Sequence, residues 1–155
     1  MNSQIKSMAI RSLLVLFCAG LFSFTSNFGG DSFEVWLNGK RVLQQYVHLS
    51  KGIQTLQLAN ASENDRLDIY YSHCGQTGTD RYITVQDEKN RALKVWKFTD
   101  ATAKNVAMSF KLKDILALKK TKTDKLNLVY SSAELPKGRL LATIVPDDGT
   151  GIARK

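Results

Sequence analysis

The sequence of 155 residues contains little proline and little cysteine, with two residues of each. The scarcity of proline and glycine excludes collagen-like chains and chains dominated by linkers. An apolar content of 43% with 23% charged side chains excludes a wholly disordered chain, and the length fits one globular domain. No apolar run approaches the roughly 20 residues that a membrane-spanning helix needs. What is left is a basic, single-domain protein with a formal net charge of +8.

The N-terminal segment has the three parts of a secretory signal peptide in the expected order. Lys6 and Arg11 make its start basic, and no acidic residue precedes Asp31. The apolar centre, residues 12–24, lies within the range of roughly 7–15 residues that is typical of signal peptides. We therefore predict an exported protein, periplasmic or secreted. Its expected parts are a signal peptide (1–25), one domain (26–146) and a flexible C-terminal tail (147–155).

The cleavage position has alternatives. A cut after Thr25, or one residue later, is favoured because Ser23 and Thr25 place small side chains at the two positions that the peptidase reads. A cut after Gly20 is the main competitor. Acylation of Cys18, as in a lipoprotein, is disfavoured because the bulky Phe17 precedes it. After cleavage the chain would carry 20 basic and 14 acidic residues, and a single cysteine cannot form an internal disulfide.

Short segments with alternating apolar residues, or rich in β-branched and aromatic residues, predict an all-β fold. An Asn-Gly pair at 38–39 separates two of them, which is the strongest short-range signal for a hairpin. About eight to nine strands at this spacing suggest a sandwich or a small barrel, and we favour a mainly antiparallel β-sandwich. The predicted strands are residues 33–37, 40–47, 53–58, 66–72, 81–86, 91–98, 106–112, 126–131 and 140–145.

Two segments interrupt this pattern. Residues 113–120 contain strong helix formers, and Asp114 is a residue type that can cap a helix. We expect one or two helical turns there, with Ile115 and Leu118 facing the core. Residues 136–138, Pro-Lys-Gly, have turn chemistry and predict a turn before the last strand.

The tripeptide His73-Cys74-Gly75 contains the only thiol of the predicted mature chain. A thiol nucleophile needs a base within hydrogen-bond reach, but side chains of consecutive strand residues point to opposite faces. We therefore interpret Cys74 as a small buried residue that ends a strand, with His73 half exposed. His48 is the other histidine, and one cysteine with two histidines makes a zinc site unfavourable. No Gly-x-Ser-x-Gly or His-Glu-x-x-His motif occurs, so we predict no cofactor and favour a protein that is not an enzyme.

Positive charge is concentrated in the second half of the chain. Residues 89–125 contain 11 basic and 3 acidic residues, whereas residues 27–88 have a net charge of −3. Such a field suits an acidic polysaccharide, anionic headgroups or an acidic protein, and export argues against nucleic acid. The alternative is a solvated face whose lysines protect edge strands. A glycan could also stack on an exposed aromatic side chain. The candidate binding residues are Trp36, Lys94, Trp96, Lys97, Lys111 and Lys113.

The layout resembles that of small exported β-rich proteins of unknown function from Bacteroidota. The features that carry the resemblance are residues 33–47 with their Asn-Gly turn, 70–80, 96–100 and 135–138. The resemblance implies no known activity and no functional residues. We expect a non-catalytic binding or envelope-associated protein. The alternatives are a small periplasmic hydrolase or thiol-dependent enzyme that uses Cys74 with a histidine, and a structural or inhibitory module whose edge strand pairs with another chain.

Cell fractionation tests the prediction of export. The protein should be recovered outside the cytoplasm without residues 1–25, because the leader is removed during translocation. Mass spectrometry of the recovered chain reads the cleavage site. Recovery of the intact polypeptide from the cytosol would contradict the prediction.

Overall fold

The structure, a computed structural model, describes residues 30–49, 52–58, 61–103, 106–121 and 123–145. The predicted signal peptide and the predicted tail lie outside these residues. Nine strands are present in the described part of the chain, with one 3₁₀ turn and one short helix. They are β1 (Ser32–Leu37), β2 (Lys40–Tyr46), η2 (Val47–Leu49), β3 (Thr55–Gln57), β4 (Arg66–Ser72), β5 (Arg81–Gln86), β6 (Ala92–Phe98), β7 (Met108–Lys111), α2 (Leu112–Leu116), β8 (Leu126–Ser132) and β9 (Leu135–Val145).

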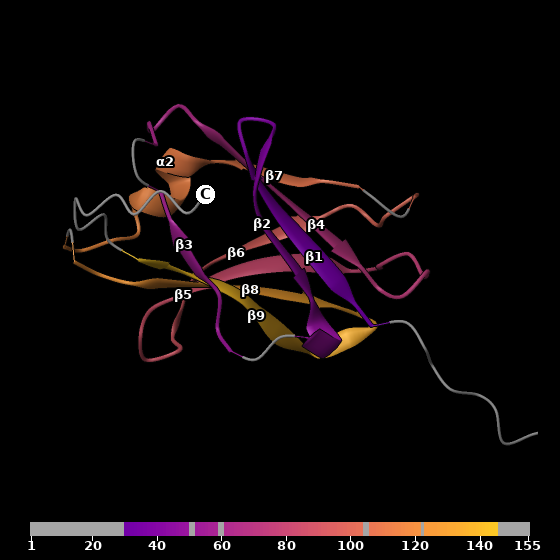
Figure 1. Cartoon of the computed structure of the whole chain (residues 1–155). Helices are drawn as coiled ribbons and strands as arrows, with labels where there is room; N and C mark the ends of the chain where they lie inside the picture. Colours follow the sequence, from indigo (N-terminus) through magenta and orange to yellow (C-terminus); the bar gives the residue numbers. More distant parts are fainter. Residues whose placement is uncertain (1–29, 50–51, 59–60, 104–105, 122, 146–155) are drawn as a thin grey trace, which may run out of the picture.

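The strands form two sheets that pack face to face, so the predicted β-sandwich is confirmed (Figure 1). Sheet A has the order β2-β1-β4-β7, and sheet B has the order β3-β9-β8-β5-β6. Neighbouring strands are antiparallel, except that the short edge strand β3 runs parallel to the end of β9. No helix among the described residues has the length and hydropathy of a membrane span.

The core fills the space between the sheets because alternate residues of each strand point inward. In β8, for example, Leu126, Leu128 and Tyr130 are buried, and the residues between them are partly exposed. In β1 the side chains of Phe33 and Val35 are buried, as the alternation predicts. The buried cluster consists of Phe33, Val35, Leu56, Leu67, Ile69, Tyr71, Ile83, Val85, Met108, Phe110, Ile115, Leu126, Leu128, Tyr130, Leu141, Ala142 and Ile144.

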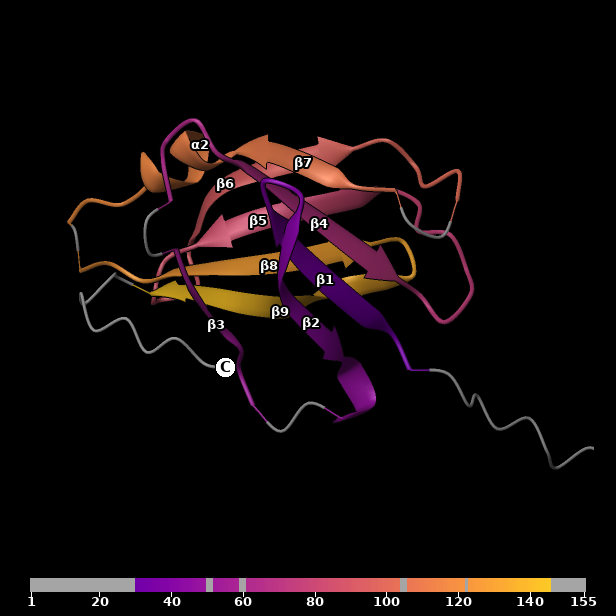
Figure 2. The same ribbon diagram turned by 45° about the horizontal axis from the view of Figure 1, so that its top comes forward.

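An aromatic seam closes one long side of the sandwich, where the edge strands β6 and β7 lie next to each other (Figure 2). The Phe110 ring packs against Trp96 with 5.4 Å between centroids, and against Phe98 with 6.1 Å. Trp96 therefore packs against Phe110 and the core and does not lie on the outer face of sheet B.

The helical segment has the predicted length of one to two turns, but it begins one residue earlier than predicted and has a different cap. Helix α2 covers Leu112–Leu116, Lys111 is its N-cap residue, and no side chain caps it. Asp114 lies in the first turn instead. Ile115 is fully buried and Leu118 packs against the core, so their predicted orientation is confirmed.

The predicted turn at residues 136–138 is wrong, because these residues belong to β9. Ser132 pairs with Leu135 and Tyr130 pairs with Arg139, which leaves residues 136–138 opposite Ser131 alone. The extra residues form a bulge, and bulges accept proline and a positive φ within a strand. Gly138 has φ +69°, and a Cβ there would lie 3.1 Å from the Val129 side chain.

The Asn-Gly hairpin gives a test of the turn geometry. Asn38 and Gly39 have φ of 50° and 77°, and a Cβ on Gly39 would meet no atom within 4 Å. Gly39→Ala should therefore lower the free energy of unfolding by about 1 kcal/mol, purely through the strain of a left-handed backbone. Gly52→Ala is the matched control, because its Cβ also meets nothing and its φ is not positive. Urea denaturation measures both variants, and equal stabilities would contradict this account.

Candidate binding site

The predicted binding residues of β6 already have partners within the protein. The Trp96 ring is packed in the aromatic seam, and the Lys94 ammonium lies over it, 4.9 Å from the ring centroid. Lys97 forms an ion pair of 3.0 Å with Asp80 and lies over the Tyr82 ring. These contacts favour the alternative role, in which the lysines protect an edge strand.

The other predicted residues lie on separate elements. Lys111 ends β7, where its register partner is Arg66 of β4, and Lys113 lies in α2. Trp36 lies on β1, on the outer face of sheet A. The structure therefore distributes the six predicted residues over β1, β6, β7 and α2 and does not bring them together.

A hollow of about 270 Å³ lies on the outer face of sheet A around Trp36. Strands β1 and β4 form it, because their antiparallel register places Ser32 opposite Ser72 and Glu34 opposite Tyr70. These side chains share one face, since alternate residues of a strand point to the same side. The hollow is lined by Ser32, Phe33, Glu34, Trp36, Tyr70 and Ser72.

The Trp36 ring is held by polar and aromatic neighbours. Its indole N–H donates a hydrogen bond of 2.8 Å to one Glu34 oxygen, and Arg41 donates to the other at 3.0 Å. The Arg41 guanidinium lies 5.9 Å from the Trp36 ring centroid, and Tyr70 meets the ring edge to face at 5.9 Å. The ring is therefore oriented before a ligand arrives, which lowers the entropic cost of binding.

Three hydroxyl groups complete the hollow, those of Ser32, Tyr70 and Ser72. None of them has a side-chain hydrogen bond to another described residue. A hydroxyl group both donates and accepts, and a hollow that combines such groups with an aromatic ring suits a small polar ligand with an apolar face. Sequence reasoning singled out Trp36 but missed Ser32 and Ser72, because the β1–β4 register that assembles the hollow does not follow from the sequence alone.

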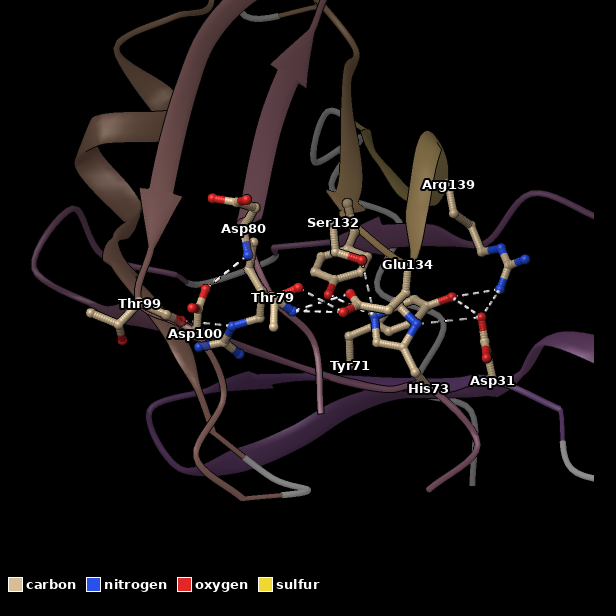
Figure 3. A network of polar contacts seen from close by, with 12 residues as sticks. Asp31, Tyr71, His73, Thr79, Asp80, Thr99, Asp100, Ser132, Glu134 and Arg139 are labelled. Atoms are coloured by element: carbon tan, nitrogen blue, oxygen red, sulfur yellow. Dashed lines mark hydrogen bonds and ion pairs between the residues drawn. The ribbon is translucent and has the colours of Figure 1, made fainter. Parts of the chain in front are cut away.

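A second group of polar side chains lies between the sheets at one end of the sandwich (Figure 3). We call it the inter-sheet cluster; it comprises Asp31, Tyr71, His73, Tyr130, Ser132, Glu134 and Arg139. Tyr71 of sheet A stacks on Tyr130 of sheet B, with 4.1 Å between ring centroids. Asp31 accepts hydrogen bonds from the Tyr71 hydroxyl at 2.7 Å and from Arg139 at 3.0 Å. These contacts join the start of β1 to β9, and thus one sheet to the other.

The predicted burial of His73 and Cys74 is wrong, because His73 is buried and Cys74 is exposed. His73 is 6% exposed, and its Nε2 lies 2.9 Å from the Tyr130 hydroxyl and 3.2 Å from the Ser132 hydroxyl. Cys74 is exposed, with φ +43°, in a tight turn closed by the N–H of Gln76 and the carbonyl of His73. The alternation of β4 explains this, because His73 continues the inward series that includes Tyr71. That signal was present in the sequence.

In the inter-sheet cluster Ser132 lies next to His73, and His73 lies next to Asp31. These three residues do not form an accessible catalytic triad. His73 Nδ1 lies 4.0 Å from Asp31, and the Ser132 side chain is buried. Gly78 closes over the cluster, since a Cβ there would lie 2.8 Å from the Tyr130 hydroxyl and 3.2 Å from His73 Nε2. Among the described residues the exposed Cys74 thiol forms no hydrogen bond with a histidine. No group of metal-binding side chains is found among these residues.

The pH dependence of stability tests the state of His73. Burial lowers its pKa, Asp31 and Glu134 oppose the shift, and the nearby arginines add to it. The unfolded chain therefore binds the proton first, and stability falls as pH decreases below the ordinary histidine pKa of about 6.5. His73→Gln should flatten this dependence between pH 7 and 5, where one proton changes stability by at most about 1.4 kcal/mol per pH unit.

The measurement is urea denaturation at several pH values, with His48→Gln as the control because it removes an exposed histidine and leaves His73 in place. Measurements above pH 5 avoid a contribution from the titration of Glu134. Burial alone would raise the pKa of Glu134, but hydrogen bonds from the Thr79 hydroxyl and N–H lower it to about 2. A wild-type slope in His73→Gln would contradict the prediction.

No protein-family model matches the chain, and no curated protein matches it.

Proposed function

We propose that this is an exported, non-catalytic binding protein that holds a neutral glycan in the hollow on the outer face of sheet A. The N-terminal pattern of a signal peptide supports export. The observation that carries the proposal is an oriented Trp36 ring beside three hydroxyl groups that have no partner in the described chain. The residues expected to bind the ligand are Ser32, Glu34, Trp36, Tyr70 and Ser72.

The chemistry of a sugar ring matches this hollow. A sugar presents C–H groups on its faces and hydroxyl groups around its edge, so it needs an apolar aromatic surface with donors and acceptors next to it. Trp36 and Tyr70 supply the aromatic surface, and Ser32, Ser72 and Glu34 supply polar atoms. The volume of about 270 Å³ lies just below the range for drug-sized ligands, which favours one sugar unit of a longer chain.

The charges on this face favour a neutral ligand. Glu34 is compensated by Arg41 at 3.0 Å. Asp68, which is 2% exposed, is compensated by Arg66 at 3.0 Å and accepts a hydrogen bond from Ser109. An acidic glycan would meet the Glu34 carboxylate in the hollow without an unpaired cation to offset it.

The same carboxylates argue against glycoside hydrolysis. That reaction uses two carboxyl groups on either side of the bond that is cleaved. Glu34 is the one carboxylate among the described residues that line the hollow, and both of its oxygens accept hydrogen bonds from neighbouring side chains. Binding without cleavage is therefore the function that this geometry supports best.

A protein partner that pairs with β2 is the second candidate. Strand β2 is an edge of sheet A. Four large apolar residues are exposed along it and the segment that follows, namely Val42, Tyr46, Leu49 and Ile53. An exposed edge strand can receive a strand from another chain. Val42 does not line the hollow, so a partner held in this way would remain bound when Trp36 is changed.

Titration of residues 26–155 with a panel of neutral oligosaccharides tests the proposal. Calorimetry should detect saturable binding, and Trp36→Ala should weaken it at least about tenfold, because the variant removes the central aromatic surface. Trp36→Phe keeps an aromatic face and should retain part of the affinity.

Tyr82→Ala is the matched control, since it removes an aromatic side chain from sheet B. Its affinity should equal that of the wild type. Binding that is lost in Tyr82→Ala but kept in Trp36→Ala would place the ligand on the other sheet. A panel without any saturable ligand would remove the support for a glycan.

A further inference from the structure

A cavity of about 260 Å³ lies at an end of the sandwich, between the β5–β6 turn and the connection from α2 to β8. Figures 1 and 2 show these two segments at the same end of the molecule. A hydrogen bond of 3.3 Å from the Lys125 N–H to Glu88 joins them. We call this the lysine cavity; it is lined by Asp87, Glu88, Lys89, Arg91, Leu93, Leu118, Lys120, Asp124, Lys125 and Leu126.

The lysine cavity is the place where the two ends of the basic region meet. Lys89 comes from the β5–β6 turn, and Lys120 and Lys125 come from the connection before β8. None of their three ammonium groups forms an ion pair with a carboxylate of the described residues. Lys119 adds a further positive charge nearby, close enough to lower the pKa of Asp124 further.

The two aspartates of the lysine cavity are engaged by their own loops, and Glu88, the third carboxylate, accepts the hydrogen bond of 3.3 Å from the Lys125 N–H. Asp87 accepts hydrogen bonds from the Arg91 side chain at 2.7 Å and from the backbone N–H groups of Lys89 and Arg91. Asp124 accepts from the N–H groups of Lys120 and Thr121 at 2.8 and 3.0 Å. These bonds lower the pKa values of both aspartates, and no metal-binding group of side chains is present among the described residues.

The floor of the lysine cavity is apolar. Leu93 and Leu118 are partly buried and pack against the core, and Leu126 belongs to the core itself. A ligand that fits must therefore bring an anionic group to the lysines and an apolar group to the leucines. An inorganic anion would leave the leucines uncovered, and a sugar would find no aromatic ring among the lining residues.

We infer that the lysine cavity binds a small amphiphilic anion, an alkyl carboxylate, at a site separate from the glycan hollow. The carboxylate meets the ammonium groups of Lys89, Lys120 and Lys125, and the alkyl chain covers Leu93 and Leu118. No residue is shared between the two sites. The charge excess of residues 89–125 then has a local use in addition to solubility.

Amide chemical shifts of residues 26–155, titrated with sodium octanoate, test this inference. Octanoate should cause saturable shifts at the amides of Lys89, Lys120 and Lys125. Sodium acetate lacks the alkyl chain and octanol lacks the charge, so each should bind at least about tenfold more weakly. Equal binding of octanol would overturn the role of the lysines, and equal binding of acetate would overturn the role of the leucines.

A matched pair of double variants locates the site. The combination of Lys120→Gln and Lys125→Gln should weaken octanoate binding about fivefold, because two ion pairs are lost. The combination of Lys111→Gln and Lys113→Gln removes the same charge from exposed positions outside the cavity and should bind like the wild type. Equal loss in both would mean non-specific attraction and overturn the inference. Trp36→Ala should retain octanoate binding even if the protein binds no glycan.

Discussion

The pairing of β1 with β4 is the contact on which both faces of sheet A depend. Its register places Val35 opposite Ile69 on the inner face and Glu34 opposite Tyr70 on the outer face. Because the side-chain period of a strand is two, a shift by one residue would exchange the two faces. The buried core and the hollow around Trp36 therefore follow from one register, which the hydrophobic inner residues hold in place.

The inter-sheet cluster adds a polar link to this apolar core. Stacking of Tyr71 on Tyr130 brings their hydroxyl groups to the end of the sandwich, where His73, Asp31 and Arg139 hydrogen-bond them. A buried polar group without a hydrogen-bond partner is costly, so the segments around this cluster must pack closely enough to keep each hydrogen bond formed. The close approach of Gly78 to Tyr130 and His73 is a consequence. The inter-sheet cluster thus joins the two sheets through stacked rings and hydrogen bonds.

The two proposed ligand sites differ in how their charges are balanced. On the outer face of sheet A each carboxylate has an arginine beside it, as in the pair of Glu34 with Arg41. In the lysine cavity Asp87 and Asp124 accept hydrogen bonds from their own loops, Glu88 accepts one from the Lys125 N–H, and the ammonium groups of Lys89, Lys120 and Lys125 form no ion pair with a described carboxylate. A neutral ligand suits the first arrangement and an anion suits the second. The net charge of the chain alone does not predict that the two sites prefer ligands of different charge.

The sequence by itself determined the strands, because alternation, turn residues and β-branched content act over only a few neighbouring positions. It determined that Trp36 faces away from the core. The same alternation predicts that His73 is buried, but we missed this because we took Cys74 as the buried residue that ends the strand. The bulge at 136–138 was hidden because proline and glycine indicate a turn as readily as a bulge. Only the tertiary structure decided which strands pair. It placed Tyr70 beside Trp36 and Lys125 beside Glu88, since such neighbours arise from long-range register and loop closure rather than from local pattern.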